Sequence, residues 1–321
     1  MLPDFSELKR HLPALTLEHP VDREGVCAEY LHYYRLDLSK RVEGVQQYFG
    51  ALDLGDYRIA CHVLMPREAR GTVVVSHGYF DHAGLFDHLL AAVVRDGYAA
   101  VIWDLPGHGL SSGEPAAIDS FEEYSQCFRD LLSALSGRLP KPWHAVGQST
   151  GGAIVLRYLF ECTEQQETPA FCAAVVLAPL IRAAQWPWVT LQYRLARHWI
   201  TSVKRVFVRN ADNAGFVDFV RTADPLQSRR IPVRWVGAMI DWAARFERYP
   251  KVDFPVRVIQ GDADGTVNWR YNLKRIRKQF PNARIDSIHG AGHHLVNEAR
   301  TRRHDVFTKI LDELHAREKT S

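Results

Sequence analysis

The segment that most restricts the fold is HAVGQSTGGAIVLRYLF, residues 144–160. An apolar run typical of a buried strand leads into Gly147 and Ser149, and an apolar helical pattern begins directly after Gly151. A chain that turns from strand to helix in so few residues brings backbone segments close together, and only glycine tolerates this at positions 147 and 151. The segment therefore predicts a strand, a tight turn with Ser149 at its apex, and a helix.

The rest of the chain repeats the alternation of strand and helix. Strands are expected within 57–66, 71–78, 98–109, 143–149, 171–180, 255–265 and 283–294, and helices within 84–97, 120–135, 151–160 and 306–318. Ser120 and Glu123 form a capping-box pattern at one helix start. Segment 57–66 alternates in polarity and is expected to be an edge strand, whereas most other strands are apolar throughout. This pattern predicts an α/β fold with a mostly parallel, doubly wound sheet that is covered on both faces.

One long segment, residues 181–250, interrupts this alternation. It has helical patterning and no clear strand, and it falls between two expected strands of the sheet. We therefore expect an N-terminal helical extension at 1–45, a core formed by 46–180 and 251–321, and a helical cap or lid insertion at 181–250.

Composition limits the class of protein and its compartment. The formal net charge is +3, and no dense Lys/Arg tract or nucleic-acid motif is present, so nucleic acid is not an expected partner. The five cysteines are odd in number and scattered, which favours a reducing compartment. The first 20 residues lack the apolar region of a signal peptide, and no apolar run is long enough to span a bilayer. We expect a cytoplasmic protein, with peripheral attachment at the inner membrane face left open.

Ser149 is a candidate nucleophile. A strand, a tight turn with serine at its apex and a helix form a nucleophile elbow, with the pattern G-x-S-x-G. The pattern occurs a second time around Ser111, but that match lies in a loop and Pro115 prevents a helix from following directly. The context therefore favours Ser149. The alternative interpretation, a small residue in a tight turn, explains neither the two flanking glycines nor the residues described next.

A serine nucleophile needs a base and a carboxylate, and in a fold of this kind they follow it in the order acid, then histidine. The loops after the strands at 255–261 and 283–288 supply both at the sheet edge where Ser149 lies. The acid candidates are Asp262 and Asp264, and the base candidates are His289, His293 and His294. Adjacent histidines also suit a metal, but no third ligand stands at metal-ligand spacing, so we expect neither metal nor cofactor.

An oxyanion hole requires two backbone donors. One is expected to be the N–H group of Thr150, the residue after the nucleophile, and the other that of Tyr79 in the loop HGYFDHAG. His77 and Gly78 are expected to shape the turn that presents Tyr79.

These motifs together resemble the α/β-hydrolase family, and within it the monoacylglycerol lipase and bacterial lysophospholipase branch. The matching stretches are VVSHGYFDHAGLF, DLPGHGLSSGEP, GQSTGG, ADPL, QGDADGTV and GAGHHLVNE, between residues 73 and 298. The resemblance implies that Asp264 is the acid, that His293 is the base, and that a helical cap covers the site. His294 then starts a helix or supports the site from behind. Gln148 and Thr150 stand where many relatives carry His and Met, so the pocket wall is expected to differ there.

The expected cap is basic and rich in tryptophan. Between residues 190 and 234, nine Lys/Arg face three Asp, which gives +6, and five of the eight tryptophans fall between 186 and 242. Apolar residues recur at spacings of three or four with basic residues between them: Trp188, Leu191, Leu195, Trp199 and Val203. This pattern suits a helix lying on an anionic lipid surface, and equally a helix that packs its apolar face on the core.

The main hypothesis is a serine hydrolase that cleaves carboxylic esters of lipids, such as a lysophospholipid or a monoacylglycerol, through an acyl-enzyme. Lipid or small-molecule esters are then the expected ligands, with peripheral membrane contact through the cap. A serine aminopeptidase or an acyltransferase would use the same machinery. A non-catalytic binding protein of this fold would usually have lost a residue of the triad, whereas here every candidate is present.

Overall fold

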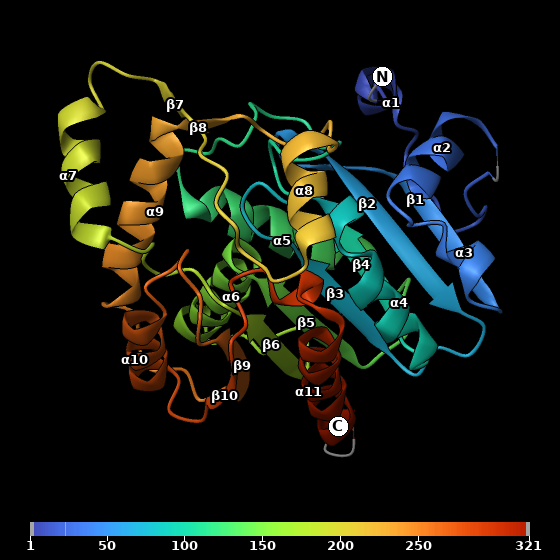
Figure 1. The fold of residues 1–321 in the computed structure, drawn as a ribbon. Helices are drawn as coiled ribbons and strands as arrows, with labels where there is room; N and C mark the ends of the chain where they lie inside the picture. Colours follow the sequence, from blue (N-terminus) through green and yellow to red (C-terminus); the bar gives the residue numbers. More distant parts are fainter. Residues whose placement is uncertain (1–2, 23, 319–321) are drawn as a thin grey trace.

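The computed structural model describes residues 3–22 and 24–318. An eight-stranded sheet with the order β1-β2-β4-β3-β5-β6-β9-β10 forms its centre (Figure 1). The strands are β1 (Val45–Leu54), β2 (Tyr57–Pro66), β3 (Thr72–Ser76), β4 (Ala99–Trp103), β5 (Trp143–Gln148), β6 (Ala173–Leu177), β9 (Val256–Gly261) and β10 (Arg284–Ile288). The pairings from β4 to β10 are parallel, and only β2 pairs antiparallel, with β1 and with β4. The expected mostly parallel sheet is confirmed.

The expectation that 57–66 forms an edge strand is wrong. β2 lies between β1 and β4, and β1, which the sequence pattern did not reveal, occupies the edge. The alternation that suggested an edge came partly from His62, but His62 is fully buried and its ring stacks on Phe49, with the centroids 4.0 Å apart. A polar residue type in a strand therefore did not mark a solvent-facing position.

Helices cover both faces of the sheet. On one face lie α5 (Phe121–Leu135), α6 (Thr150–Gln165) and α10 (Trp269–Gln279), and on the other lie α4 (Asp87–Arg95) and α11 (Arg300–Glu318). The capping box of Ser120 and Glu123 is formed at the start of α5. Two hydrophobic clusters result, one on each face, as a doubly wound sheet requires.

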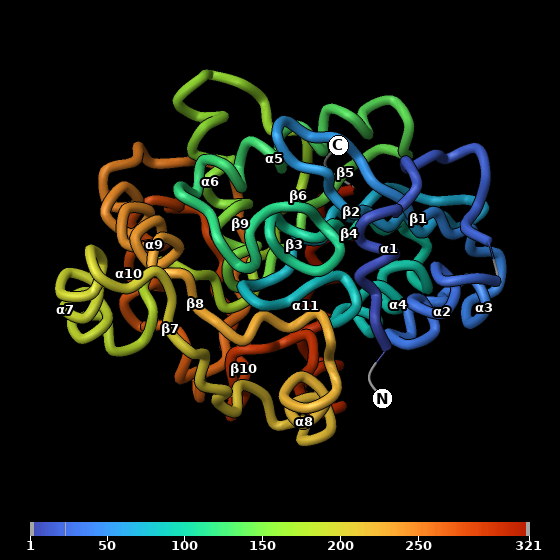
Figure 2. The backbone as a smooth tube through the Cα atoms, turned by 90° about the horizontal axis from the view of Figure 1, so that it is seen from above, coloured from blue at the N-terminus to red at the C-terminus, as the bar shows by residue number. Residues whose placement is uncertain are grey.

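The N-terminal segment is part of the folded body. Its helices are α1 (Ser6–His11), α2 (Gly25–Tyr33) and α3 (Leu38–Arg41), and they lie beside β1 (Figures 1 and 2). Phe5, Leu8, Tyr30 and Leu31 are buried in the same hydrophobic cluster as α4 and α11. In both views these helices lie on the side of the molecule opposite α7 (Trp186–Ala196).

Residues 181–250 contain α7, α8 (Ala214–Thr222) and α9 (Val233–Phe246), which lie in the upper half of Figure 1. The expectation that this segment lacks strands is wrong, because β7 (Ser202–Lys204) and β8 (Arg230–Pro232) pair antiparallel. Strands of three residues are too short to produce a readable alternation. Among the described residues, no helix is long and apolar enough to cross a membrane.

Candidate active site

Ser149 lies between β5 and α6 with φ 54° and ψ −109°, a conformation that residues with a side chain rarely adopt. The backbone around it is crowded. A Cβ atom on Gly147 would lie 2.4 Å from the carbonyl oxygen of Gly151, and one on Gly151 would lie 2.0 Å from that of Ser76. Both contacts are far too short, so the turn requires glycine at these two positions.

The structure brings Ser149, His293 and Asp264 together from three different loops. The hydroxyl oxygen of Ser149 lies 2.9 Å from Nε2 of His293, and Nδ1 of His293 lies 2.8 Å from Oδ2 of Asp264. All three residues are less than 10% exposed. Gln148 holds the histidine from behind, because its amide donates a hydrogen bond of 2.9 Å to the His293 carbonyl oxygen. These contacts have the geometry of a nucleophile, a base and an orienting carboxylate.

Hydrogen bonds to Asp264 favour its ionised form. The backbone N–H groups of Thr266 and Val267 donate to Oδ1, and the amide of Gln260 donates to Oδ2. Burial would raise the pKa of Asp264, but the charge and hydrogen bond of His293, together with these donors, hold it below 3.8. Burial likewise opposes the charged form of His293, yet Asp264 raises the pKa of His293 above 6.5. The carboxylate therefore stabilises an imidazolium at this position.

The rival candidates from the same loops pair with each other elsewhere. Nδ1 of His289 lies 2.9 Å from Oδ2 of Asp262, and the side chain of His289 is 99% exposed. The second motif serine, Ser111, is buried; its hydroxyl donates to the carbonyl oxygen of Asp104 and accepts from the N–H group of Ala60. The structure therefore places these three candidates outside the site and gives Ser111 a structural role.

His294 contacts a residue that sequence reasoning missed. Its Nε2 lies 3.0 Å from Oδ2 of Asp81, and the N–H group of Gly78 donates to the same oxygen. Burial opposes ionisation of Asp81, but the nearby His294 ring holds the pKa of Asp81 below its usual value. His294 thus supports the loop after β3 from behind. The signal in the sequence that could have found Asp81 was an acidic residue two positions after Tyr79, in the loop expected to supply an oxyanion donor.

That loop is held in one conformation. Nδ1–H of His77 donates to the carbonyl oxygen of Gly78, and Nε2 of the same ring accepts from the N–H group of Leu105, so a single neutral tautomer fits. Burial lowers the pKa of His77 to about 3, which keeps the ring neutral. A Cβ atom on Gly78 would lie 3.3 Å from the Cβ atom of Ser149, so the loop passes directly beside the serine.

The two expected oxyanion donors border this point. Thr150 opens α6, where the first N–H groups of a helix have no intrahelical acceptor. Within the described residues, the N–H groups of Tyr79 and Thr150 donate to no protein acceptor. The Tyr79 ring stacks on Trp235 of α9 with the centroids 3.5 Å apart, and its hydroxyl donates to the carbonyl oxygen of Ala116. The side chain is therefore anchored while the backbone donor stays available.

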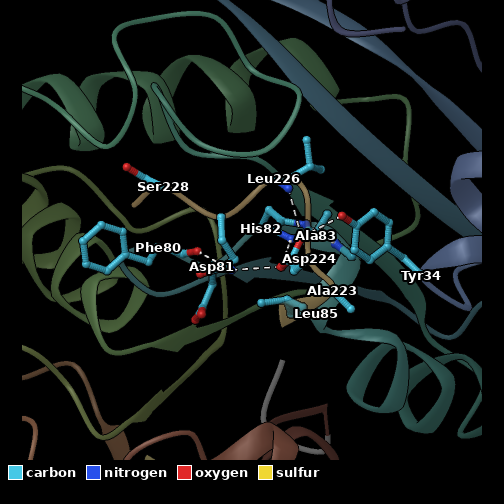
Figure 3. A network of polar contacts seen from close by, with 12 residues as sticks. Tyr34, Phe80, Asp81, His82, Ala83, Leu85, Ala223, Asp224, Leu226 and Ser228 are labelled. Atoms are coloured by element: carbon cyan, nitrogen blue, oxygen red, sulfur yellow. Dashed lines mark hydrogen bonds and ion pairs between the residues drawn. The ribbon is translucent and has the colours of Figure 1, made fainter. Parts of the chain in front are cut away.

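A buried polar network joins this loop to two distant segments (Figure 3). Nε2 of His82 lies 2.9 Å from Oδ2 of Asp224, and the Tyr34 hydroxyl donates to Oδ1 of Asp224 at 2.8 Å. In the neutral His82 ring, the hydrogen bond from the N–H group of Gly84 to Nδ1 leaves the proton on Nε2, which faces Asp224; a second proton on Nδ1 would replace the Gly84 bond. The network connects the N-terminal segment, the loop after β3 and the segment after α8. Sequence reasoning missed it.

The apolar stripe of the basic segment is exposed. Trp188, Leu195 and Trp199 are 56%, 69% and 88% exposed, and Leu191 and Val203 are exposed as well. The alternative in which this stripe packs on the core is therefore wrong. Among the described residues, no cluster of three or more His, Cys, Asp or Glu side chains is placed to hold a metal ion.

Comparison with known proteins agrees with this architecture. Residues 67–300 match the family model Hydrolase_4, described as serine aminopeptidase, S33. A monoacylglycerol lipase of Mycolicibacterium smegmatis is 34% identical over 107 residues, which cover 33% of this chain and only 38% of that protein. The human monoglyceride lipase is 24% identical over 252 residues, 75% of this chain and 81% of that protein.

Solved structures share the fold. A soluble variant of the monoglyceride lipase from Saccharomyces cerevisiae superposes with a TM-score of 0.70 at 18% identity, covering 82% of this chain and 92% of that one. The monoacylglycerol lipase of Paleococcus ferrophilus gives a TM-score of 0.67 at 21% identity, covering 80% and 97%. The family match extends over most of the chain and includes the loops that carry Ser149 and His293. The chain therefore belongs to the Hydrolase_4 family of α/β-hydrolases, in the branch that resembles monoacylglycerol lipases.

Proposed function

We propose that this protein is a serine hydrolase that cleaves carboxylic esters of lipids, with a lysophospholipid or a monoacylglycerol as substrate. The observation that supports this most strongly is the hydrogen-bonded series from Ser149 through His293 to Asp264 at the elbow after β5. All three groups are present and correctly spaced, which argues against a non-catalytic binding protein.

The reaction follows from these positions. The hydroxyl oxygen of Ser149 attacks the ester carbonyl while Nε2 of His293 accepts its proton, and Asp264 stabilises the imidazolium. The N–H groups of Tyr79 and Thr150 bind the oxyanion of the tetrahedral intermediate. Collapse of that intermediate breaks the ester bond, and His293 returns the proton to the departing alcohol. Water then attacks the acyl-enzyme by the same steps and releases the fatty acid, with no cofactor taking part.

A lipid substrate agrees with the names of the relatives and with one surface of the molecule. We define the cap surface as the exposed side chains Trp188, Leu191, Leu195, Trp199, Ile200 and Val203. Arg194, Arg197 and Lys204 accompany them in the sequence. Exposed tryptophan and leucine beside basic residues favour the interface of an anionic bilayer. We propose that residues 181–250 act as a cap that contacts the inner membrane face peripherally.

The decisive experiment compares hydrolysis of a lysophospholipid and a monoacylglycerol of equal chain length by the wild type and by Ser149→Ala. We expect turnover of at least one lipid by the wild type and none above background by the variant. Ser111→Ala is the matched control, because it removes the serine of the other G-x-S-x-G motif. Its loss of two structural hydrogen bonds should lower stability and leave the kcat of the folded enzyme intact.

The same assay separates the alternatives. The family description names a serine aminopeptidase, and an acyltransferase would use the same acyl-enzyme. A peptidase that binds a free amine needs carboxylates near its site, whereas residues 190–234 carry nine Lys/Arg and three Asp. Absence of Ser149-dependent turnover of both lipids, with activity on an aminoacyl amide or transfer to an added alcohol, would replace the ester hydrolase proposal.

A further inference from the structure

Arg205, directly after β7, is held between two aromatic rings. Its guanidinium carbon lies 3.9 Å from the ring centroid of Phe80 and 4.3 Å from that of Phe207. Nη1 donates to the side-chain oxygen of Gln227. Nε and Nη2 donate to no acceptor among the described residues. The guanidinium is therefore fixed in position, and the N–H groups on its Nε and Nη2 atoms remain free to donate hydrogen bonds.

No carboxylate neutralises this group directly. Arg209, Arg221 and Arg234 in the same part of the chain each form an ion pair within 4.0 Å, whereas neither Arg205 nor its neighbour Arg229 forms one with any described residue. The guanidinium carbon of Arg229 lies 5.0 Å from the centroid of Phe207, the same ring that Arg205 contacts. Two unneutralised like charges beside one ring repel each other, and a bound anion would remove that cost.

Arg205 is also partly withdrawn from water. Arg205 is half-buried, whereas other nearby arginines that form no ion pair with a described residue, such as Arg197 and Arg230, are exposed to water. Burial, together with the charge of Arg229 and against the attraction of Asp81, lowers the pKa of Arg205 to about 10, so the guanidinium stays protonated at neutral pH. A charge that has lost part of its hydration and forms no ion pair binds an anion more strongly than a solvated one.

The position of Arg205 links it to the candidate active site. Phe80, the residue on which it stacks, directly follows Tyr79, and the amide of Gln227 donates to the carbonyl oxygen of Phe80 at 2.8 Å. Two residues before Phe80, Gly78 passes beside Ser149. An anion bound to Arg205 would therefore border the loop that is expected to hold the ester carbonyl.

We propose that Arg205, assisted by Arg229, binds the phosphate group of a lysophospholipid whose acyl ester lies at Ser149. The inference rests on the proposed function and selects the phosphate-bearing lipid over the neutral monoacylglycerol. A guanidinium with two free donors matches two phosphate oxygens, whereas an uncharged glycerol would leave the positive charge without a partner.

Steady-state kinetics test this selection. The measured quantity is the ratio of kcat/KM for lysophosphatidic acid to that for the monoacylglycerol of equal chain length, both in neutral detergent micelles. We expect Arg205→Gln to lower this ratio at least tenfold. Arg230→Gln is the matched control: Arg230 pairs with Lys204, next to Arg205 on the β7–β8 ribbon, but its exposed guanidinium donates to Ser202, so its loss should leave the ratio unchanged. If Arg205 only stabilised the loop, its substitution would lower kcat/KM equally for both substrates. An unchanged ratio would therefore overturn the proposal.

Calorimetric titration of the Ser149→Ala protein tests binding without turnover. We expect lysophosphatidic acid to bind more tightly than the equal-chain monoacylglycerol, and Arg205→Gln in the same background to abolish the difference. Equal binding of the two lipids would refute the site. Inorganic phosphate, titrated in parallel, would assign the site to a free anion if it bound as tightly as the lipid. Binding through Arg205 combined with no wild-type hydrolysis of any ester would reject the proposed function and leave the phosphate site standing.

Discussion

At the scale of single residues, Asp262 and Asp264 differ in environment although they stand two positions apart. Asp264 is buried against His293, and Asp262 pairs with an exposed histidine. Asp264→Asn should lower kcat/KM by roughly 10³–10⁴-fold, because the imidazolium loses its stabilising charge and the ring its fixed tautomer. Asp262→Asn should change kcat/KM less than about twofold, as expected for a surface substitution. Steady-state assays on a soluble ester would measure both, and similar losses in the two variants would contradict this assignment.

As the proposed base, His293 should make activity depend on pH in a defined direction. The ring must be neutral to accept the Ser149 proton, and Asp264 raises its pKa above 6.5 against the effect of burial. The value of kcat/KM should therefore rise with pH and reach half its maximum above pH 6.5. In Asp264→Asn the charge that raises the pKa is gone, so the midpoint should move to lower pH. A wild-type midpoint at or below 6.5 would be inconsistent with the Asp264–His293 pair.

The residues of the site differ in how far the sequence could predict them. Ser149 could be chosen over Ser111 because the strand, the glycines and the helix around it are all local. The choice between Asp262 and Asp264 depended on family resemblance, because both follow the same strand. Asp81 and Asp224 lie in stretches that match the family, but their contacts could not be predicted, because their partners His294 and His82 lie more than 100 positions away in the chain. Tertiary packing alone makes these contacts.

At the scale of elements, α7, like α8, has no buried residue. Its periodic apolar stripe could be read from the sequence, but periodicity does not say whether another element covers that face. The sequence pattern also failed to predict β1, β7 and β8. β1 is an edge strand without clear alternation, and β7 and β8 are only three residues long. Core strands such as β3 and β4 could be predicted because they are apolar throughout.

Because the apolar side chains of α7 and of the turn after it are exposed, their substitution should weaken membrane binding without changing the stability of the fold. Leu195→Ser together with Trp199→Ser should change the free energy of unfolding by less than about 1 kcal/mol, because neither side chain is packed. Binding to vesicles that contain anionic phospholipid should weaken at least tenfold, because two apolar anchors are lost. Val26→Ser, an exposed substitution in α2, is the control in a sedimentation assay. Equal vesicle binding by all three proteins would exclude the cap surface as the membrane contact.

At the scale of the whole molecule, Asp224 joins three parts of the chain that are far apart in sequence. Tyr34 contributes from the N-terminal segment and His82 from the loop beside Ser149, and the side chains of Asp224 and His82 are fully buried. The amide of Gln227 donates to the same carboxylate and to the carbonyl oxygen of Phe80. The N-terminal helices, the proposed cap and the expected oxyanion loop are therefore stabilised by one shared carboxylate, so a change there should affect folding and catalysis together.

Asp224→Asn should lower the free energy of unfolding by about 1.5–3 kcal/mol, the range for hydrogen bonds to a charged group. The loss should depend on pH. The network holds the pKa of Asp224 below 3.8 despite burial, so its contribution is present above pH 3.8 and is lost as pH falls through the lowered value. Asp224 and other acids raise the pKa of His82 above 6.5 despite burial, so that contribution is complete below pH 6.5 and is lost as pH rises through the raised value. Urea unfolding should thus show the largest difference between Asp224→Asn and wild type between pH 3.8 and 6.5, and a smaller difference at pH 9.

The control is Asp218→Asn, because Asp218 is an exposed residue of α8 that pairs with Arg221. Its free energy of unfolding should stay within about 0.5 kcal/mol of wild type at every pH. A pH-independent loss in Asp224→Asn would show that the Asp224–His82 pair is not charged in the native protein.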